Sequence, residues 1–142
     1  MYKKFKKRQK RAITLLEIMI VILLIGLISG VISYNLKGTL DKGRAFRSDQ
    51  GAKRLADILN LEIQMGNVEL EEILKEDVGK NRDRLLTTCV RNSGLVNPKD
   101  IDSFLRDGWK KPYKIQASED GSTVIITSPA LEEYLKRTSS HP

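Results

Sequence analysis

Histidine and cysteine are almost missing from this sequence, which limits the chemistry that it can carry. The one histidine, His141, is next to the C-terminal residue, and the one cysteine, Cys89, cannot form an internal disulfide. We expect Cys89 to be a small buried or half-buried side chain. The sequence also shows no paired carboxylates in a cleft-like context, no phosphate-binding loop and no metal-ligand spacing. We therefore predict that the protein is not an enzyme.

Acidic residues are absent from the first 12 positions, which hold seven lysines and arginines. The net charge of the chain is +7, and without this leader the remaining residues comprise 18 basic and 18 acidic side chains. The high isoelectric point is therefore a property of the leader, and we expect no nucleic-acid partner. A basic segment before an apolar one is typical of the cytoplasmic end of a membrane helix.

Proline is absent before Pro98, so residues 13–65 can form one uninterrupted helix. Within it, residues 18–36 contain no charged side chain and are mostly Ile, Leu and Val. A helix of about 20 apolar residues is long enough to cross a bilayer. We therefore predict a membrane-spanning segment in the first part of the helix.

The second part of this helix is amphipathic. Ala52, Leu55 and Leu59 follow the helical spacing and share one face, which needs other elements to pack against. Gly66 and Asn67 form a plausible stop. We expect a small folded domain to cover this face.

Charge is segregated along the same region. Residues 37–54 hold six basic and two acidic side chains, whereas residues 57–77 hold seven acidic and one basic. Two solvated faces are the simpler interpretation. Complementary surfaces on neighbouring copies of the chain are the alternative.

The remainder of the chain is predicted to form short elements. The predicted elements are, in order, helices near residues 69–77 and 81–91, a loop at 94–99, strands at 113–117 and 123–127, and a terminal helix that starts at Pro129. An Asp-Gly pair at positions 120 and 121 is a hairpin-turn signal between the two strands. Ser128 is the expected N-cap of the terminal helix.

Glu17 interrupts the apolar segment and needs an explanation, because an ionisable group at the centre of a bilayer costs roughly 2.5–3.5 kcal/mol. A secretory signal peptide cleaved after a small residue such as Ser33 does not explain it, and neither does a plain single-pass anchor. A cut between Ala12 and Ile13 would explain it. The new terminal amine could then pair with the Glu17 carboxylate, within one chain or between packed helices.

The stretch RAITLLEIMIVILLIGLISGVISYNLKG resembles the N-terminus of the type IV pilin and pseudopilin superfamily, and most of all the major pseudopilins of type II secretion. The resemblance implies that a prepilin peptidase removes the leader between Ala12 and Ile13 and that Ile13 is N-methylated. It also implies that Glu17, with Thr14, acts in assembly. The family usually has glycine and phenylalanine at the cut and a proline at the position of Tyr34.

A second stretch, RDGWKKPYKI, resembles the Asp-Pro-Trp-Gly-Asn-Pro-Tyr segment of the same family. Asp107, Trp109, Pro112 and Tyr113 match, whereas positions 108, 110 and 111 differ. We interpret this stretch as a structural turn whose Trp and Tyr pack onto the long helix while the chain enters the sheet.

The resemblance implies an α+β, pilin-like fold, in which a long N-terminal helix packs on a small domain with short helices and a short antiparallel sheet. The predicted division is a leader at 1–12, a transmembrane helix at 13–36, its amphipathic continuation at 37–66, and a periplasmic domain at 67–142 with a hairpin near 113–127. The family usually binds calcium in its C-terminal loops. One acidic pair, Glu119 and Asp120, does not supply six to eight oxygen ligands, so no cofactor and no metal are predicted.

The function that the resemblance implies is that of a structural subunit of the periplasmic pseudopilus of a type II secretion system. The implied partners are other copies of the chain in a filament, the prepilin peptidase, the minor pseudopilins and the inner-membrane platform. The implied location is the inner membrane, with a cytoplasmic N-terminus and a periplasmic domain. The alternatives are a type IV pilus or competence pilin, and a single-pass anchored periplasmic binding or enzymatic domain.

Overall fold

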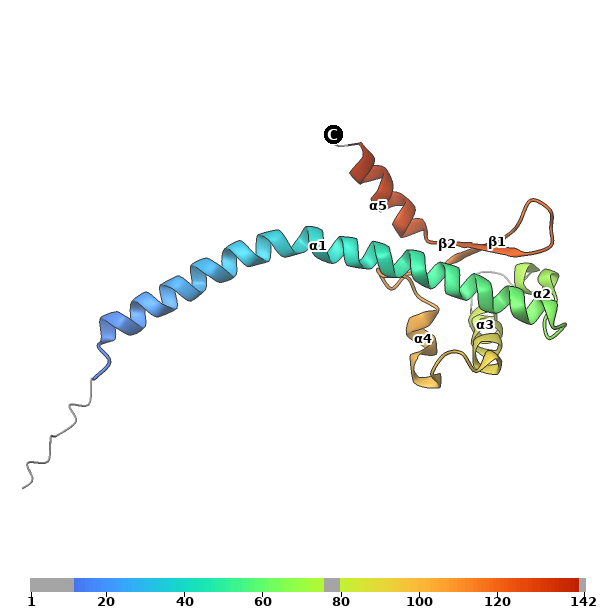
Figure 1. The fold of residues 1–142 in the computed structure, drawn as a ribbon, viewed down its shortest axis with the longest axis horizontal. Helices are drawn as coiled ribbons and strands as arrows, with labels where there is room; N and C mark the ends of the chain where they lie inside the picture. Colours follow the sequence, from blue (N-terminus) through green and yellow to red (C-terminus); the bar gives the residue numbers. More distant parts are fainter. Residues whose placement is uncertain (1–11, 76–79, 141–142) are drawn as a thin grey trace, which may run out of the picture. The chain divides into compact units, whose positions relative to one another are not determined.

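The computed structural model describes residues 12–75 and 80–140, and it confirms the predicted α+β class (Figure 1). One long helix, several short helices and one two-stranded antiparallel sheet make up the described part of the chain. The predicted leader, apart from Ala12, and the C-terminal His141 lie outside the described residues. In chain order the elements are α1 (Leu15–Gln64), α2 (Leu70–Lys75), α3 (Lys80–Ser93), the 3-10 helix η1 (Pro98–Asp100), α4 (Ile101–Phe104), β1 (Lys114–Ala117), β2 (Val124–Thr127) and α5 (Pro129–Ser139).

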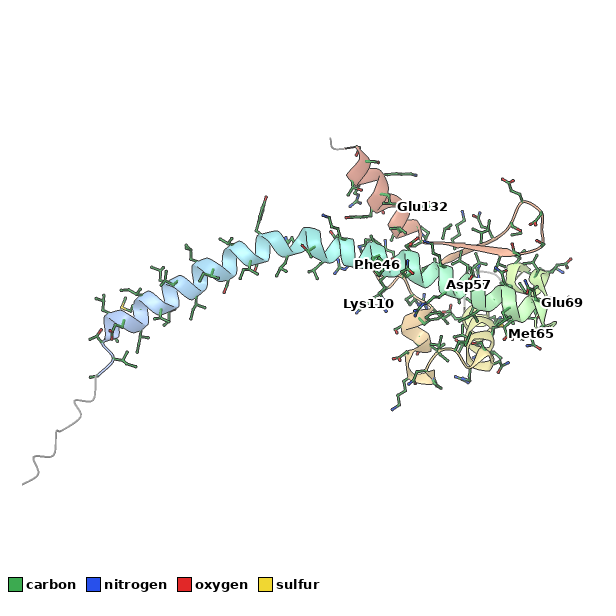
Figure 2. All side chains as sticks on the ribbon, viewed as in Figure 1. Phe46, Asp57, Met65, Glu69, Lys110 and Glu132 are labelled. Carbon is green, nitrogen blue, oxygen red and sulfur yellow. The ribbon has the colours of Figure 1, made fainter. Side chains whose placement is uncertain are left out.

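The chain divides into two compact units, residues 1–39 and residues 40–142. In the first unit, every described side chain between residues 12 and 34 is exposed. Large apolar side chains project from this part of α1 all along its length (Figure 2). The helix is long and apolar enough to cross a membrane, as the uncharged run at 18–36 predicted.

The second unit has a hydrophobic core to which α1 contributes one face. Ala52, Leu55 and Leu59 are 7%, 1% and 0% exposed, so the predicted amphipathic stripe is confirmed. The other elements supply the remaining core side chains, among which the most deeply buried are Ile73, Val90, Ile101 and Val124. Cys89 is buried in the same core, as predicted, and burial raises the pKa of its thiol.

The end of α1 lies where the Gly66-Asn67 signal predicted it. The N–H of Asn67 donates to the Glu62 carbonyl and the N–H of Gly66 donates to the Ile63 carbonyl, each at 3.0 Å. This pair of bonds is the Schellman arrangement, which requires a left-handed residue after the helix. Gly66 has φ of +74°, a conformation that costs glycine little.

The two strands form the hairpin that the sequence predicted. Lys114 pairs with Thr127 and Ala117 with Val124 in an antiparallel register. Gly121, with φ of +68°, lies in the connecting turn. The outer edge of β2 is occupied by a side chain of α1, because the N–H of Val124 donates to Oδ1 of Asn60 at 2.8 Å.

The segment between α1 and the sheet contains more helix than the sequence predicted. Helices α2 and α3 confirm the two predicted helices, as far as the described residues reach. The prediction of a loop at 94–99 is wrong for positions 98 and 99, because η1 starts at Pro98 and continues into α4. The physical reason is local, since the side chain of Asn97 accepts a hydrogen bond from the N–H of Lys99 and so caps this turn.

Candidate functional site

The N-terminus of α1 is closed by two reciprocal hydrogen bonds between Thr14 and Glu17. The N–H of Thr14 donates to Oε2 of Glu17 at 2.9 Å, and the N–H of Glu17 donates to Oγ1 of Thr14 at 3.3 Å. This is a capping box, which satisfies two of the backbone donors that a helix N-terminus leaves unpaired. Glu17 therefore has a local structural role at the start of the apolar helix.

Sequence reasoning did not find this role, although the signal was present. A Thr followed three residues later by Glu, directly before an apolar run, is the pattern of a capping box. The predicted cleavage residues Ala12 and Ile13 precede the helix and are exposed, Ile13 at 73%. Cleavage between them, methylation of Ile13 and a role of Glu17 in assembly stay predictions.

The second predicted site is a turn around Asp107, a carboxylate that is only 1% exposed. Its Oδ1 accepts hydrogen bonds from the N–H groups of Trp109, at 2.9 Å, and Lys111, at 2.8 Å. Its Oδ2 accepts a bond of 2.7 Å from the hydroxyl of Ser128. That hydroxyl also caps α5, since it accepts from the N–H of Leu131 at 3.1 Å. Asp107 thus joins its own turn to the start of the terminal helix.

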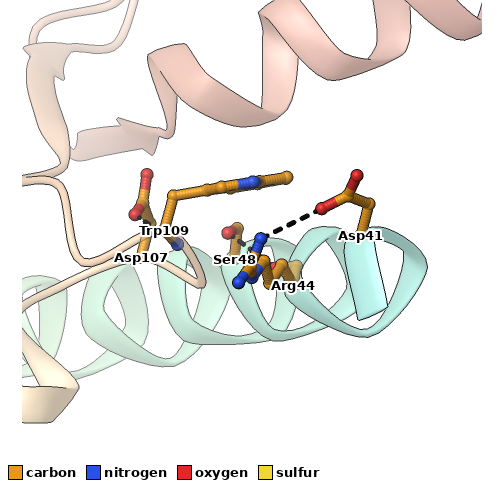
Figure 3. Close-up of polar contacts among 5 residues, drawn as sticks. All are labelled: Asp41, Arg44, Ser48, Asp107 and Trp109. Atoms are coloured by element: carbon orange, nitrogen blue, oxygen red, sulfur yellow. Dashed lines mark hydrogen bonds and ion pairs between the residues drawn. The ribbon is translucent and has the colours of Figure 1, made fainter. Parts of the chain in front are cut away.

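The same turn is docked on α1 through Ser48, which is fully buried. The Ser48 hydroxyl donates to the carbonyl of Arg44 and accepts from the N–H of Gly108, both at 2.8 Å. The approach is so close that a Cβ atom at Gly108 would lie 2.2 Å from the Arg44 carbonyl oxygen. Figure 3 draws Ser48 and Arg44 of α1 with Asp107 and Trp109 of the turn, and its dashed line marks the ion pair between Arg44 and Asp41, which is 3.1 Å long.

The three other predicted turn residues have different neighbours. Tyr113 is 8% exposed, and its hydroxyl lies against the backbone of Gly51 in α1. Burial, with a further contribution from the Asp107 carboxylate, raises the pKa of Tyr113 to about 12. Trp109 pairs with Tyr134 of α5, with the ring centroids 5.8 Å apart. Pro112 forms an isolated β-bridge with Arg106.

One position of the turn adopts an unusual backbone conformation. Lys110 has φ of +62°, and it is the one residue other than glycine with positive φ in the described part of the chain. A left-handed conformation is unfavourable for a side chain with a Cβ atom and readily adopted by glycine. The pilin segment that this stretch resembles has glycine at this position, a residue that adopts such a backbone conformation readily.

Sequence reasoning missed the polar residues that hold the turn in place. Ser48 lies in the middle of a long helix, where nothing in the local pattern distinguishes it from an exposed serine. Gly108 was regarded only as a departure from the family segment. Among residues 12–75 and 80–140, no group of three or more His, Cys, Asp or Glu could hold a metal ion.

Comparison with known proteins gives three relatives that cover most of the chain. Proteins named "Putative outer membrane protein" from Chlamydia muridarum and Chlamydia trachomatis serovar D are each 33% identical over 126 residues, which is 89% of this chain and 93% and 92% of the relatives. A protein of the same name from Chlamydia pneumoniae is 32% identical over 133 residues, 92% of this chain and 99% of the relative. The chain belongs to this chlamydial family. No protein-family model matches the chain, and no solved structure matches it.

Membership of this family corrects the function inferred from the resemblance. The prediction of a type II secretion pseudopilus subunit is wrong, because relatives 32–33% identical over most of the chain are named outer membrane proteins and not pseudopilins. The resemblance rested on two short stretches, whereas the chlamydial relatives match across both units. The first part of α1 is long and apolar enough to cross a membrane, and the names of the relatives do not support an inner-membrane location.

Proposed function

We propose that this chain is a cell-envelope protein that is held in a membrane by the first part of α1 and carries residues 40–142 as a folded domain outside the bilayer. The observation that carries this proposal is that every described side chain of the apolar helix in residues 15–34 is exposed. Burying one large aliphatic side chain is worth about 1.5–3 kcal/mol, so a helix with this surface is strongly unfavourable in water. Lipid removes that cost, because a helix satisfies its backbone polar groups internally.

The orientation that we propose follows from charge. The basic leader is retained on the cytoplasmic side during insertion, and residues 40–142 reach the opposite side of the membrane. The chlamydial relatives are named outer membrane proteins. The proposed orientation, in contrast, is that of a protein inserted into the inner membrane from the cytoplasm. Separating inner from outer membranes on a density gradient, followed by detection of the full chain, decides between the two locations.

The anchor itself is tested by extraction. We expect the full-length protein to remain in the membrane pellet after washing at alkaline pH and to be released only by detergent. Replacing Leu23, which is 69% exposed in the apolar helix, by Lys should shift the protein into the soluble or degraded fraction. The matched control is Leu135→Lys in α5, a leucine that is 53% exposed in the folded domain. Equal behaviour of the two variants would contradict the anchor.

We further propose that copies of the chain associate through this helix, as the resemblance to the pilin superfamily implies. Gly26 and Gly30 are four positions apart, and a Cβ atom at either would meet nothing within 4 Å. Small residues at this spacing allow close approach of two helices in lipid. Gly30→Leu should weaken cross-linking between copies in native membranes, and Gly43→Leu, outside the apolar run, should leave it unchanged.

Processing of the leader is the remaining proposal from the resemblance. The left-handed backbone of Lys110, at the position where the pilin segment has glycine, supports it from a second part of the chain. The intact mass of the protein extracted from its native membranes is the test. A mass that corresponds to residues 13–142 with one added methyl group would support cleavage between Ala12 and Ile13. A full-length mass would contradict it.

A further inference from the structure

A cavity of about 610 Å³ opens on the surface of the folded domain, between α1 and the segment that contains η1 and α4. We call it the arginine pocket and define it by Phe46, Arg47, Arg54, Phe104, Arg106 and Tyr113. Its volume lies within the range of about 300–1,000 Å³ that is usual for small-molecule sites. All of these residues belong to the unit 40–142, so the pocket does not depend on the proposed membrane anchor.

The charge of the pocket is positive. Three arginines line it against one carboxylate, that of Asp100. Arg106 is paired with Asp83, which lies outside the pocket lining, at 2.9 Å. Among the residues that the structure describes, the Arg47 guanidinium donates only to the backbone carbonyl of Ser103, at 3.3 Å, and this bond does not neutralise its charge. Within residues 12–75 and 80–140, Arg54 has no carboxylate within ion-pair distance.

The hydroxyl group of Tyr113 adds a polar donor to the same wall. The Tyr113 side chain is 8% exposed, and its hydroxyl oxygen is not among the fully buried atoms without a hydrogen-bond partner in the described part of the chain, so it is open to the pocket. This oxygen lies 2.3 Å from the point that a Cβ atom of Gly51 would occupy, and Gly51 itself lines the pocket. The lack of a side chain at Gly51 keeps this hydroxyl accessible from the pocket.

Apolar side chains complete the pocket on its open side. Phe46 and Leu95, both pocket-lining residues, are 69% and 68% exposed. Aromatic and aliphatic groups at the mouth of a positively charged cavity favour a ligand that carries an anion next to an apolar group.

We propose that the arginine pocket binds an organic phosphate, a phosphate monoester whose esterified group is aromatic or a diacylglycerol. The guanidinium groups of Arg47 and Arg54 pair with the phosphate oxygens, and the Tyr113 hydroxyl donates to the same group. A phosphate presents more oxygens in more directions than a carboxylate, so it can accept from two guanidinium groups and a hydroxyl together. Phe46 and Leu95 contact the ester group. A soluble metabolite and a phospholipid headgroup share this chemistry.

Calorimetric titration of the full-length protein in a phosphate-free maltoside detergent tests the site, with phenyl phosphate and inorganic phosphate as probes. We expect phenyl phosphate to bind and inorganic phosphate to bind more weakly, because it makes no apolar contact. Arg54→Gln should weaken phenyl phosphate binding by at least ~10-fold, since it removes a charge-assisted hydrogen bond. Tyr113→Phe should weaken it several-fold while leaving the charge of the pocket unchanged.

The matched control is Arg91→Gln, which removes an exposed arginine of α3 that does not line the pocket. Its affinity for phenyl phosphate should equal that of the unaltered protein. Absence of binding, or an equal loss in Arg91→Gln and Arg54→Gln, overturns the proposal. Unfolding temperatures measured on all three variants separate loss of the site from loss of the fold.

A competition arm identifies the source of the phosphate. Dihexanoyl phosphatidic acid is added to the complex with phenyl phosphate in the same detergent. If stoichiometric phosphatidic acid displaces phenyl phosphate, the proposed site is supported and its ligand is a lipid headgroup. If phenyl phosphate stays bound, the site is supported and its ligand is a soluble ester. Because the readout is calorimetric and needs no bilayer, failure here leaves the membrane-anchor proposal untouched.

Discussion

The N–H of Gly108 donates a hydrogen bond of 2.8 Å to the hydroxyl of Ser48, which lies 60 positions earlier in the chain. This bond joins α1 to the turn that contains Asp107, and Asp107 in turn accepts from Ser128 at the start of α5. Three elements that are far apart in the sequence are therefore held by one chain of buried polar contacts.

Removal of the Ser48 hydroxyl should destabilise the folded domain. Ser48→Ala leaves the part-buried N–H of Gly108 without its acceptor, which costs about 1–3 kcal/mol. Chemical denaturation of the full-length protein in detergent, monitored by Trp109 fluorescence, measures the change. Ser139→Ala near the end of α5 is the control, because that serine is exposed and its hydroxyl bonds only within its own helix. A free energy of unfolding equal to that of the control would contradict the docking role of Ser48.

Gly108→Ala should be more damaging than Ser48→Ala. The new methyl group would lie 2.2 Å from the Arg44 carbonyl oxygen and 2.6 Å from the Arg44 Cα, so the turn has to move away from α1. Movement breaks the bond to Ser48 and disturbs the buried side chains around it. Gly43→Ala is the matched control, since nothing lies within 4 Å of its Cβ position and Ala favours the helix by about 0.5–1 kcal/mol. The two substitutions should therefore change stability in opposite directions.

Replacement of Lys110 by glycine should stabilise the domain. Lys110 has φ of +62°, and relief of a left-handed conformation at a residue with a Cβ atom is worth about 1 kcal/mol. Lys110 is exposed, so little packing is lost. The midpoint of denaturant unfolding should rise for Lys110→Gly and stay unchanged or fall for Lys111→Gly, the neighbouring exposed lysine. A lower midpoint for Lys110→Gly would show that the turn gains more from the lysine side chain than it loses through its backbone.

The elements that the sequence predicted correctly are those with local signals. The stop of α1 needs only Gly66 and Asn67, the hairpin needs an Asp-Gly turn between two β-type runs, and α5 needs Ser128 followed by Pro129. Each signal lies within a few residues of the structure that it produces. Such signals can be recognised in the sequence without knowledge of the rest of the fold.

The features that sequence reasoning missed depend on distant partners. Ser48 and Asn60 look like ordinary polar residues of a helix, and their roles appear only when Gly108 and Val124 are placed beside them. The functional prediction failed for a related reason. It rested on the N-terminal helix and one turn, while the match to the chlamydial relatives runs over 89–92% of the chain.

The stability of the folded domain should depend on Tyr113 at high pH. Its pKa is raised from 10.0 to about 12 in the folded state, mainly by burial, so the folded protein resists ionisation of a hydroxyl that the unfolded chain ionises near pH 10. The corresponding stability is complete below pH 10 and is lost as the pH rises through about 12. We expect the free energy of unfolding to fall over this range and to fall less in Tyr113→Phe. Parallel curves for the two proteins would contradict the assignment.

Glu17 can now be tested against two explanations, a local cap and a charge that pairs between helices. The capping box needs an acceptor that reaches the N–H of Thr14, and Gln supplies one as well as Glu does. If Glu17 acts as a helix cap, the Thr14 amide should exchange its hydrogen slowly in detergent micelles in Glu17→Gln. In Glu17→Ala this slow exchange should be lost.

The same variants report on association between copies. Cross-linking in native membranes should be equal for Glu17→Gln and the unaltered protein if the negative charge is dispensable. If the charge pairs with the amine of a cleaved chain, Glu17→Gln should lose association as completely as Glu17→Ala does, because an unpaired buried amine is costly. We expect the first outcome, since the capping box already gives the Glu17 carboxylate a partner in its own chain, the N–H of Thr14.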